Sequence, residues 1–114
     1  MSKRYIPRRG DIVWLQFTPQ AGHEQSGVRP AIVVSPRAYN SKVGLALFCP
    51  ITSQVKGYPF EVLLPPGIKA QGAILADQLK SLDWRVREAK LFCVSPPEVM
   101  EEVMAKILAL LEGD

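Results

Sequence analysis

Histidine and cysteine are scarce in this chain of 114 residues, which contains one histidine, His23, and two cysteines, Cys49 and Cys93. Because cysteine, histidine and aspartate form no close grouping, the ligand sets of zinc proteins are missing. Both cysteines lie within apolar segments, which favours reduced core residues over a disulfide. One histidine and no Gly-x-Ser-x-Gly motif also give no indication of a serine-hydrolase triad.

Long apolar runs and glycine-rich phosphate loops are missing too. No segment approaches the roughly 20 apolar residues of a membrane span, and no apolar stretch follows the basic N-terminus. No glycine-rich loop precedes a predicted helix, so we expect no nucleotide cofactor. The sequence therefore predicts a cytoplasmic protein without membrane contact, metal or cofactor. Its length suits a single domain over residues 1–114.

The net charge of +3 conceals an uneven distribution. Residues 1–97 contain thirteen Lys and Arg against six Asp and Glu, whereas residues 98–114 contain one Lys against five acidic residues. A basic body suits a polyanionic partner, because phosphate contacts dominate affinity for nucleic acids. A surface charge that only keeps the protein in solution explains the same numbers.

Short segments rich in β-forming residues follow one another from residue 11 to about 95. The pattern predicts strands over 11–17, 29–35, 44–51, 57–64, 72–77 and 91–94. Residues 36–40 and 81–87 fit turns or short helical pieces. The polar connection 18–27 is longer than an ordinary hairpin loop, and loops of this length often carry function.

One helix is predicted at the C-terminus. Ser95 and Glu98 have the spacing of a capping box, with a proline at the first helical position. Apolar residues then recur three and four positions apart, at Val99, Met100, Val103, Met104, Ile107, Leu108 and Leu111. We expect this stripe to pack on the sheet. The predicted fold is mainly β (α+β): a small, strongly bent antiparallel sheet or β-barrel with a C-terminal helix.

Polar residues stand where the predicted strands end. Arg29 opens the second strand and Thr52 closes the third, so the two meet at one rim if these strands are neighbours. Each has an ordinary explanation as well, because arginine suits an exposed strand end and threonine is a good strand former. Taken alone, these residues predict no more than a small basic β-barrel suited to nucleic acid.

Several ordered blocks of the sequence form one extended signature. Within residues 10–35 they are Gly-Asp-Ile-Val-Trp, Phe-x-Pro, and Gly-His-Glu-Gln-x-Gly-x-Arg-Pro-Ala-x-Val-x-Ser. Further blocks are Tyr-Asn (39–40), Cys-Pro-Ile-Thr-Ser (49–53), Gly-Tyr-Pro-Phe-Glu-Val (57–62) and Ala-Asp-Gln-Leu-Lys-Ser-Leu-Asp-Trp-Arg (76–85). Together these blocks resemble the MazF/PemK toxin family. The resemblance covers roughly residues 5–112 without large insertions, so it is much more specific than a single motif.

The resemblance implies a homodimer of SH3-like antiparallel β-barrels that acts as an endoribonuclease, or mRNA interferase. Such toxins cleave single-stranded RNA at short sequences without a metal and leave 2′,3′-cyclic phosphate and 5′-hydroxyl ends. A cognate antitoxin neutralises them. Because the RNA site is expected to be basic, we expect the antitoxin to present an acidic segment to it.

The family's catalytic arginine and threonine fall on Arg29 and Thr52, and its loop glutamate falls on Glu24, which we take as a third catalytic candidate. Arg29 suits the binding of phosphate and the stabilisation of its charge, because a guanidinium forms bidentate hydrogen bonds and keeps its proton. Thr52 can donate to a phosphate oxygen. Glu24 is the expected base, with His23 as its rival. Candidate substrate-binding residues are His23, Gln25, Asn40, Lys56, Asp77, Gln78 and Lys80.

One departure and two other functions stay open at this point. Val28 stands where some family members carry histidine, which weakens any mechanism that uses that side chain. A toxin of the same fold that binds gyrase needs no catalysis, and a non-catalytic barrel can bind RNA without cleaving it. Neither function requires Arg29 and Thr52 to meet, and an RNA-cleavage assay separates them from the endoribonuclease.

Overall fold

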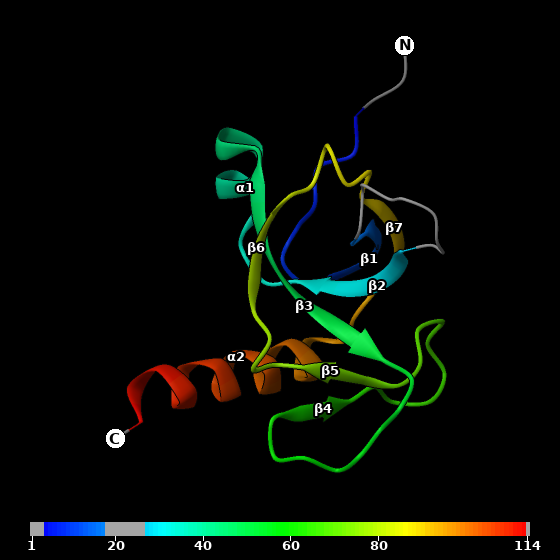
Figure 1. Cartoon of the computed structure of the whole chain (residues 1–114), viewed down its shortest axis with the longest axis vertical. Helices are drawn as coiled ribbons and strands as arrows, with labels where there is room; N and C mark the ends of the chain where they lie inside the picture. The colour runs from blue at the N-terminus through cyan, green and yellow to red at the C-terminus, as the bar shows by residue number, and fades with distance from the viewer. Residues whose placement is uncertain (1–3, 18–26, 114) are drawn as a thin grey trace.

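The computed structural model describes residues 4–17 and 27–113, which form seven strands and two helices (Figure 1). The strands are β1 (Asp11–Gln16), β2 (Val28–Val33), β3 (Leu45–Thr52), β4 (Glu61–Leu63), β5 (Ala73–Leu75), β6 (Lys80–Asp83) and β7 (Lys90–Val94). The helices are α1 (Arg37–Val43) and α2 (Pro97–Glu112). All strand pairs are antiparallel, which confirms the predicted fold class of a mainly β protein with a C-terminal helix.

The long strand β3 organises the sheet, whose order is β4-β5-β3-β2-β1-β7 with β6 also on β3. One edge of β3 pairs with β2, and the other edge is divided between β6 and β5. Because two strands share one edge, the sheet bends strongly around the residues it encloses (Figure 1). Among the described strands, the end strands β4 and β7 do not pair. The predicted barrel is therefore not closed.

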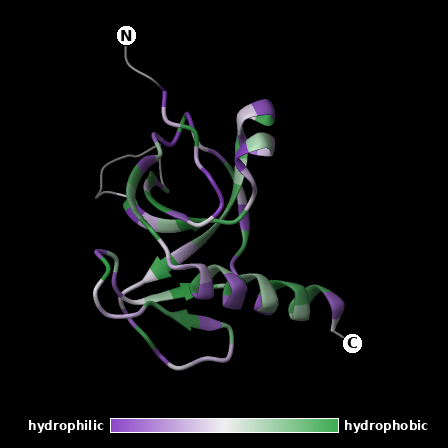
Figure 2. Ribbon diagram, turned by 180° about the vertical axis from the view of Figure 1, so that it is seen from behind, coloured by the Kyte–Doolittle hydropathy of each residue, from purple (hydrophilic) through white to green (hydrophobic). Residues whose placement is uncertain are grey.

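Two apolar clusters lie on opposite faces of this bent sheet. Because side chains alternate along a strand, Ala46 and Phe48 of β3 enter one cluster while Cys49 and Ile51 enter the other. The first cluster, which we call the inner cluster, lies inside the curve and contains buried residues of β1, β2 and β3 together with Trp84. The second lies between the sheet and α2, which crosses the sheet in Figure 2.

Three local predictions were wrong or incomplete. Residues 80–83 form strand β6 rather than part of a helical turn, because β3 offers them a free edge. The Ser95 hydroxyl donates to the Gly10 carbonyl at 2.8 Å instead of capping α2, whose N-cap is Pro96. The apolar stripe of α2 is buried only in part, since Leu108 and Leu111 are exposed.

Neither helix in the described segments is long and apolar enough to cross a membrane.

Candidate active site

The pairing of β2 with β3 brings Arg29 and Thr52 to the same end of the sheet. The assigned register places Ala31 opposite Pro50. Continued by two residues along each strand, this register sets Arg29 across from Thr52. The prediction that the second and third strands are neighbours is confirmed, and both residues stand at the same end of this strand pair.

Both side chains also lie on the same face. Arg29 is two residues from Ala31, and Thr52 is four residues from Phe48, so each shares a strand face with a member of the inner cluster. Arg29 is exposed and Thr52 is half-buried, which places them at the solvent end of this apolar cluster. At such a position both groups are accessible to a polyanion. The strands that carry them are fixed by the packing of the inner cluster.

The Thr52 hydroxyl is held in a defined orientation. Its oxygen accepts a hydrogen bond from the Gln54 backbone N–H at 3.0 Å. Because this contact uses the oxygen as an acceptor, the hydroxyl proton is left to donate to a bound group. Arg29 likewise offers only donors. Each of the two groups can therefore donate a hydrogen bond to a phosphate oxygen.

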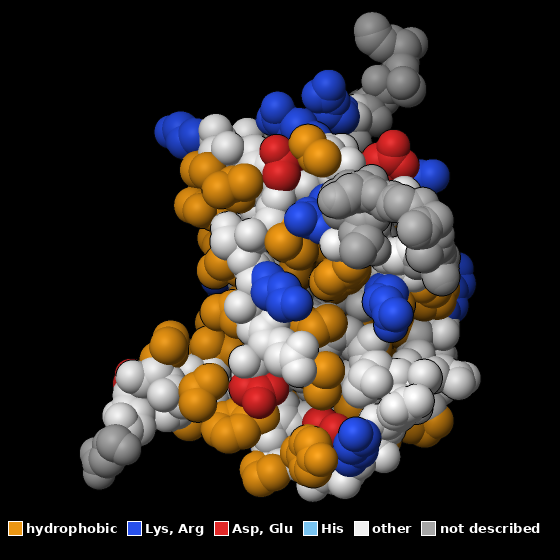
Figure 3. Space-filling view, in the orientation of Figure 1, with side chains coloured by type: hydrophobic (Ala, Val, Ile, Leu, Met, Phe, Trp, Pro, Cys, Tyr) orange, Lys and Arg blue, Asp and Glu red, His pale blue; other side chains and the backbone are white. Residues whose placement is uncertain are grey.

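Lys80 lies on the same face of the sheet, at the start of β6. It pairs with Phe48, which places it on the inner face, and its ammonium nitrogen lies 5.8 Å from the centre of the Phe17 ring. Phe17 is itself packed against the inner cluster. We call Arg29, Thr52 and Lys80 the polar rim. In the view of Figure 3, basic side chains lie in the middle of the molecular face shown and along its top.

Lys56 extends the basic surface beyond the rim. It lies in the exposed connection after β3, where its ammonium nitrogen is 6.0 Å from the centre of the Tyr58 ring. The Glu61 carboxylate accepts the backbone N–H groups of Lys56 and Gly57, which fixes this connection. Tyr58 is 60% exposed, and sequence reasoning missed it although an aromatic residue two positions from a lysine was a usable signal.

Asp77 and Gln78 form the exposed turn that leads from β5 into β6. The Gln78 backbone N–H donates to the Leu75 carbonyl at 3.0 Å, which closes the turn. Their side chains precede Lys80 by two or three residues and stay available for a ligand.

The predicted contact between Asn40 and substrate is wrong, because this side chain is fully buried. Its amide donates to the Pro7 and Ser35 carbonyls at 2.9 and 3.0 Å, and its oxygen accepts the Ser35 hydroxyl. The Asn40 carbonyl accepts the Trp84 indole N–H at 3.0 Å. Asn40 therefore joins four segments of the fold and has no group left for RNA.

Three other predicted residues, His23, Glu24 and Gln25, lie outside the described residues. The described residues on either side of this segment are hydrogen-bonded to each other, since the Phe17 N–H donates to the Gly27 carbonyl at 2.9 Å. Their roles stay predictions.

The cysteines are free, as predicted, and Cys49 is fully buried. Burial, with a further contribution from the charge of Asp77, raises the pKa of the Cys49 thiol to about 12. The thiol therefore stays protonated near neutral pH and is no nucleophile. Within residues 4–17 and 27–113, no three His, Cys, Asp or Glu side chains are grouped so that they can hold a metal ion.

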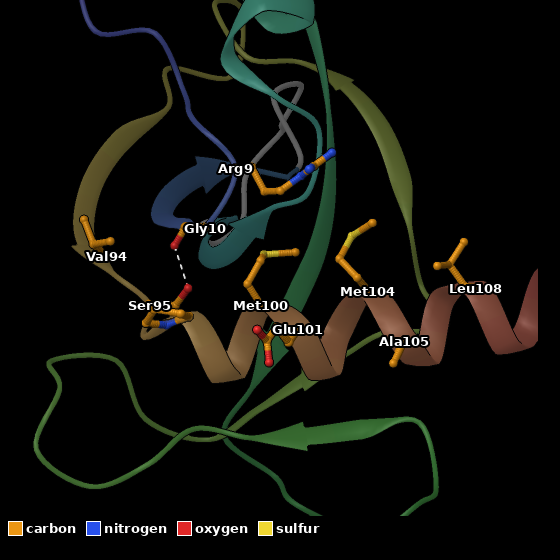
Figure 4. Close-up of a pocket in the computed structure, with 10 residues that line it drawn as sticks. Arg9, Gly10, Val94, Ser95, Met100, Glu101, Met104, Ala105 and Leu108 are labelled. Atoms are coloured by element: carbon orange, nitrogen blue, oxygen red, sulfur yellow. Dashed lines mark hydrogen bonds between the residues drawn. The ribbon is translucent and has the colours of Figure 1, made fainter.

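A groove of about 650 Å³ beside α2 shares no residue with the polar rim. Met100, Met104 and Leu108 project into it from one side of the helix, and Arg9 and Val94 border it (Figure 4). The Arg9 guanidinium is used within the fold, where Nε donates to the Val34 carbonyl at 2.6 Å. We call this surface the apolar groove.

Comparison with known proteins connects these features to a family. The sequence profile described as PemK-like, MazF-like toxin of type II toxin-antitoxin system matches residues 8–111. The endoribonuclease toxin MazF of Escherichia coli K12 is 48% identical over 111 residues, which cover 97% of this chain and 99% of that protein. The endoribonuclease toxin ChpB of the same strain is 35% identical over 118 residues, which cover 98% and 100%.

Solved structures agree with this relationship over nearly the whole chain. A crystal structure of MazF from Deinococcus radiodurans has a TM-score of 0.86 at 54% identity, and the match covers 95% of this chain and 98% of that one. MazF in a MazE-MazF crystal structure from the same organism has a TM-score of 0.87 at 46% identity, covering 97% and 100%. This chain belongs to the PemK-like, MazF-like toxins of type II toxin-antitoxin systems.

Proposed function

We propose that this endoribonuclease toxin cleaves single-stranded RNA at the polar rim, without a metal and at short sequences. The observation that supports the proposal is the β2–β3 register, which, when continued by two residues along each strand, brings Arg29 and Thr52 opposite each other next to a packed cluster. Relatives that align over almost the full length are endoribonuclease toxins, which supports the same reaction class here.

In this reaction the RNA supplies its own nucleophile. The 2′-oxygen attacks the adjacent phosphorus, the bond from phosphorus to the 5′-oxygen breaks, and the products carry 2′,3′-cyclic phosphate and 5′-hydroxyl ends. A base takes the 2′-hydroxyl proton and an acid returns a proton to the leaving oxygen. The protein must also stabilise the extra negative charge on phosphorus as it becomes five-coordinate.

Arg29 stabilises that charge. A guanidinium keeps its proton at any ordinary pH, so we assign Arg29 to electrostatic stabilisation rather than to proton transfer. Thr52 donates its hydroxyl proton to a non-bridging oxygen while Gln54 holds the hydroxyl oxygen. Glu24 acts as the base in this proposal, with His23 as the alternative.

The remaining candidates bind substrate around the rim. Lys80 and Lys56 neutralise flanking phosphates, and each lies beside an aromatic ring, Phe17 or Tyr58. Unpaired bases bind by stacking on aromatic rings, so these neighbours support a single-stranded substrate. Hydrogen bonds from Asp77, Gln78 and Gln25 to the edges of the RNA bases would then contribute to the choice of sequence.

Two protein partners belong to the proposal. The first is a cognate antitoxin whose acidic segment covers the basic rim, as the MazE-MazF complex of a relative and the charge of residues 1–97 support. The second is another copy of this chain in a homodimer, supported by the apolar groove and by the 47% exposure of Leu108. Both fit a toxin that acts on messenger RNA in the cytoplasm.

The test is incubation of the purified protein with a long single-stranded RNA in EDTA, followed by mapping of product ends. We expect discrete cuts with 5′-hydroxyl ends, and a rate about 1000-fold lower for Arg29→Ala because a charge-stabilising group is lost. Arg37→Ala, at an exposed position of α1, is the matched control and should cleave normally. RNA left intact by the folded wild type would favour the gyrase-binding alternative. Normal cleavage by Arg29→Ala would remove Arg29 from the mechanism.

A further inference from the structure

The end of β3 pairs with a different strand from the rest of β3. Its pairing with β6 ends at Phe48, and its pairing with β2 ends at Pro50. Thr52 pairs instead with Ala73 of β5. The place of the Thr52 hydroxyl relative to Arg29 therefore depends on β5 and not on hydrogen bonds to the strand that carries Arg29.

Gly72, the residue before β5, lies directly against the backbone of Thr52. A Cβ atom on Gly72 would be 2.1 Å from the Thr52 carbonyl oxygen, 3.0 Å from its carbonyl carbon and 3.3 Å from the Ser53 Cα. Non-bonded heavy atoms prefer separations of about 3.5–4.0 Å, so the first distance is a severe overlap. Gly72 also has a φ of +112°, which side chains rarely adopt.

A backbone hydrogen bond also restrains Gly72 on the side away from Thr52. Its carbonyl accepts the Leu64 backbone N–H at 3.0 Å, at the end of β4. A side chain at position 72 would therefore meet Thr52 on one side while β4 holds the glycine from the other. The peptide between Thr52 and Ser53 ends the strand and is the part that can yield.

We infer that Gly72 is a positioning residue of the cleavage site, because its missing side chain lets β5 hold the Thr52 hydroxyl beside Arg29. The inference rests on the proposed role of Thr52. A side chain at position 72 would displace that hydroxyl, and a misplacement of about 1 Å at a reacting centre costs about 100-fold in rate. The loss should appear in kcat and not in RNA affinity.

Two glycine variants separate this contact from backbone strain. Gly67 has a φ of +95°, but nothing lies within 4 Å of a Cβ placed there. Gly67→Ala thus imposes strain alone, whereas Gly72→Ala imposes strain and the contact. We expect kcat for Gly72→Ala to be about 100-fold below that of Gly67→Ala. Affinity for an RNA with a 2′-deoxy group at the cut should match between them. Equal kcat values would overturn the inference.

Thr52→Val completes a double-mutant cycle, because it removes the hydroxyl and keeps the shape. If Gly72 acts through Thr52, Gly72→Ala should lower kcat little further in the Thr52→Val background. Fully multiplicative losses would overturn the inference about Gly72. A Thr52→Val protein that cleaves like wild type would overturn the proposed role of Thr52 instead, so the two failures are distinguishable.

A second variant guards against loss of folding in Gly72→Ala. Ser53→Gly gives the backbone after Thr52 more freedom to yield to the added methyl group, so the double variant Ser53→Gly, Gly72→Ala folds more readily. Circular dichroism and thermal unfolding identify the folded protein. We expect the double variant to show the same loss of about 100-fold in kcat against Ser53→Gly alone. Equal kcat values for these two proteins would overturn the inference.

Discussion

The polar rim and the apolar groove show how one small chain prepares two surfaces for different kinds of partner. The rim places Arg29, Thr52 and Lys80 at the solvent end of the inner cluster, where charge and hydrogen-bond donors face outward. The groove places Met104 and Leu108 of α2 along an open surface with little charge.

Binding at the two surfaces is driven by different interactions. Binding at the rim depends on neutralised phosphates, so it should weaken steeply with salt. Binding at the groove depends on apolar area removed from water, so it should respond weakly to salt and strongly to a buried charge. This contrast separates RNA binding from chain association and gives each a distinct experimental signature.

The largest expected effect concerns Asn40, which sequence reasoning placed on the RNA-binding side. Asn40→Ala removes buried hydrogen bonds to Pro7 and Ser35, so we expect the free energy of unfolding to fall by about 2–4 kcal/mol. Urea denaturation measures this loss, and Ser41→Ala at the exposed neighbouring position is the control. An unchanged stability with a raised KM would instead support the predicted role of Asn40 in substrate binding.

An intermediate effect is expected in the groove. Leu108→Glu introduces a charge into the surface proposed to join two copies, so the dissociation constant of the homodimer should rise at least about tenfold. Leu110→Glu is a matched control, because both leucines are 47% exposed on α2 but only Leu108 lines the groove. Sedimentation velocity over a concentration series measures both. Equal weakening by the two variants would remove the groove as the dimer surface.

The smallest effect is expected at the edge of the rim. Lys80→Ala should weaken RNA binding a few-fold and reduce the slope of log affinity against log salt by about 0.7, the contribution of one phosphate contact to a single strand. Fluorescence anisotropy with a 2′-deoxy RNA measures the slope at several salt concentrations. Lys42→Ala, on exposed α1, should leave it unchanged. The same slope for both variants would place Lys80 outside the RNA path.

Much of the fold could be predicted from sequence because its signals are local. The β-branched and aromatic residues of β1, β2 and β3 mark strands without reference to anything distant. The apolar spacing of α2 likewise predicts a helix and its buried face, and Val99, Val103 and Ile107 are buried as expected. Arg29 and Thr52 stand at the ends of two strong strands, so the prediction that they meet needed only that β2 and β3 be neighbours.

The features that sequence reasoning missed depend on residues far apart in the chain. Strand β6 has little apolar alternation of its own and forms because β3 has a free edge. Ser95 has a capping-box spacing, but its hydroxyl finds the carbonyl of Gly10, 85 positions away. Asn40 is a polar residue that sequence reasoning expected to be accessible, yet its partners Pro7 and Trp84 lie 33 and 44 positions away in the chain and help to bury it.

The sequence by itself therefore determined most of the strands and the C-terminal helix, because β propensity and apolar spacing act within a few residues. It also determined which side chains can bind phosphate. Only the tertiary structure decided where these groups stand, because a hydrogen-bond partner or a close approach between strands depends on chain closure over long distances. Gly72 is the clearest case, since its role exists only where β5 meets the end of β3.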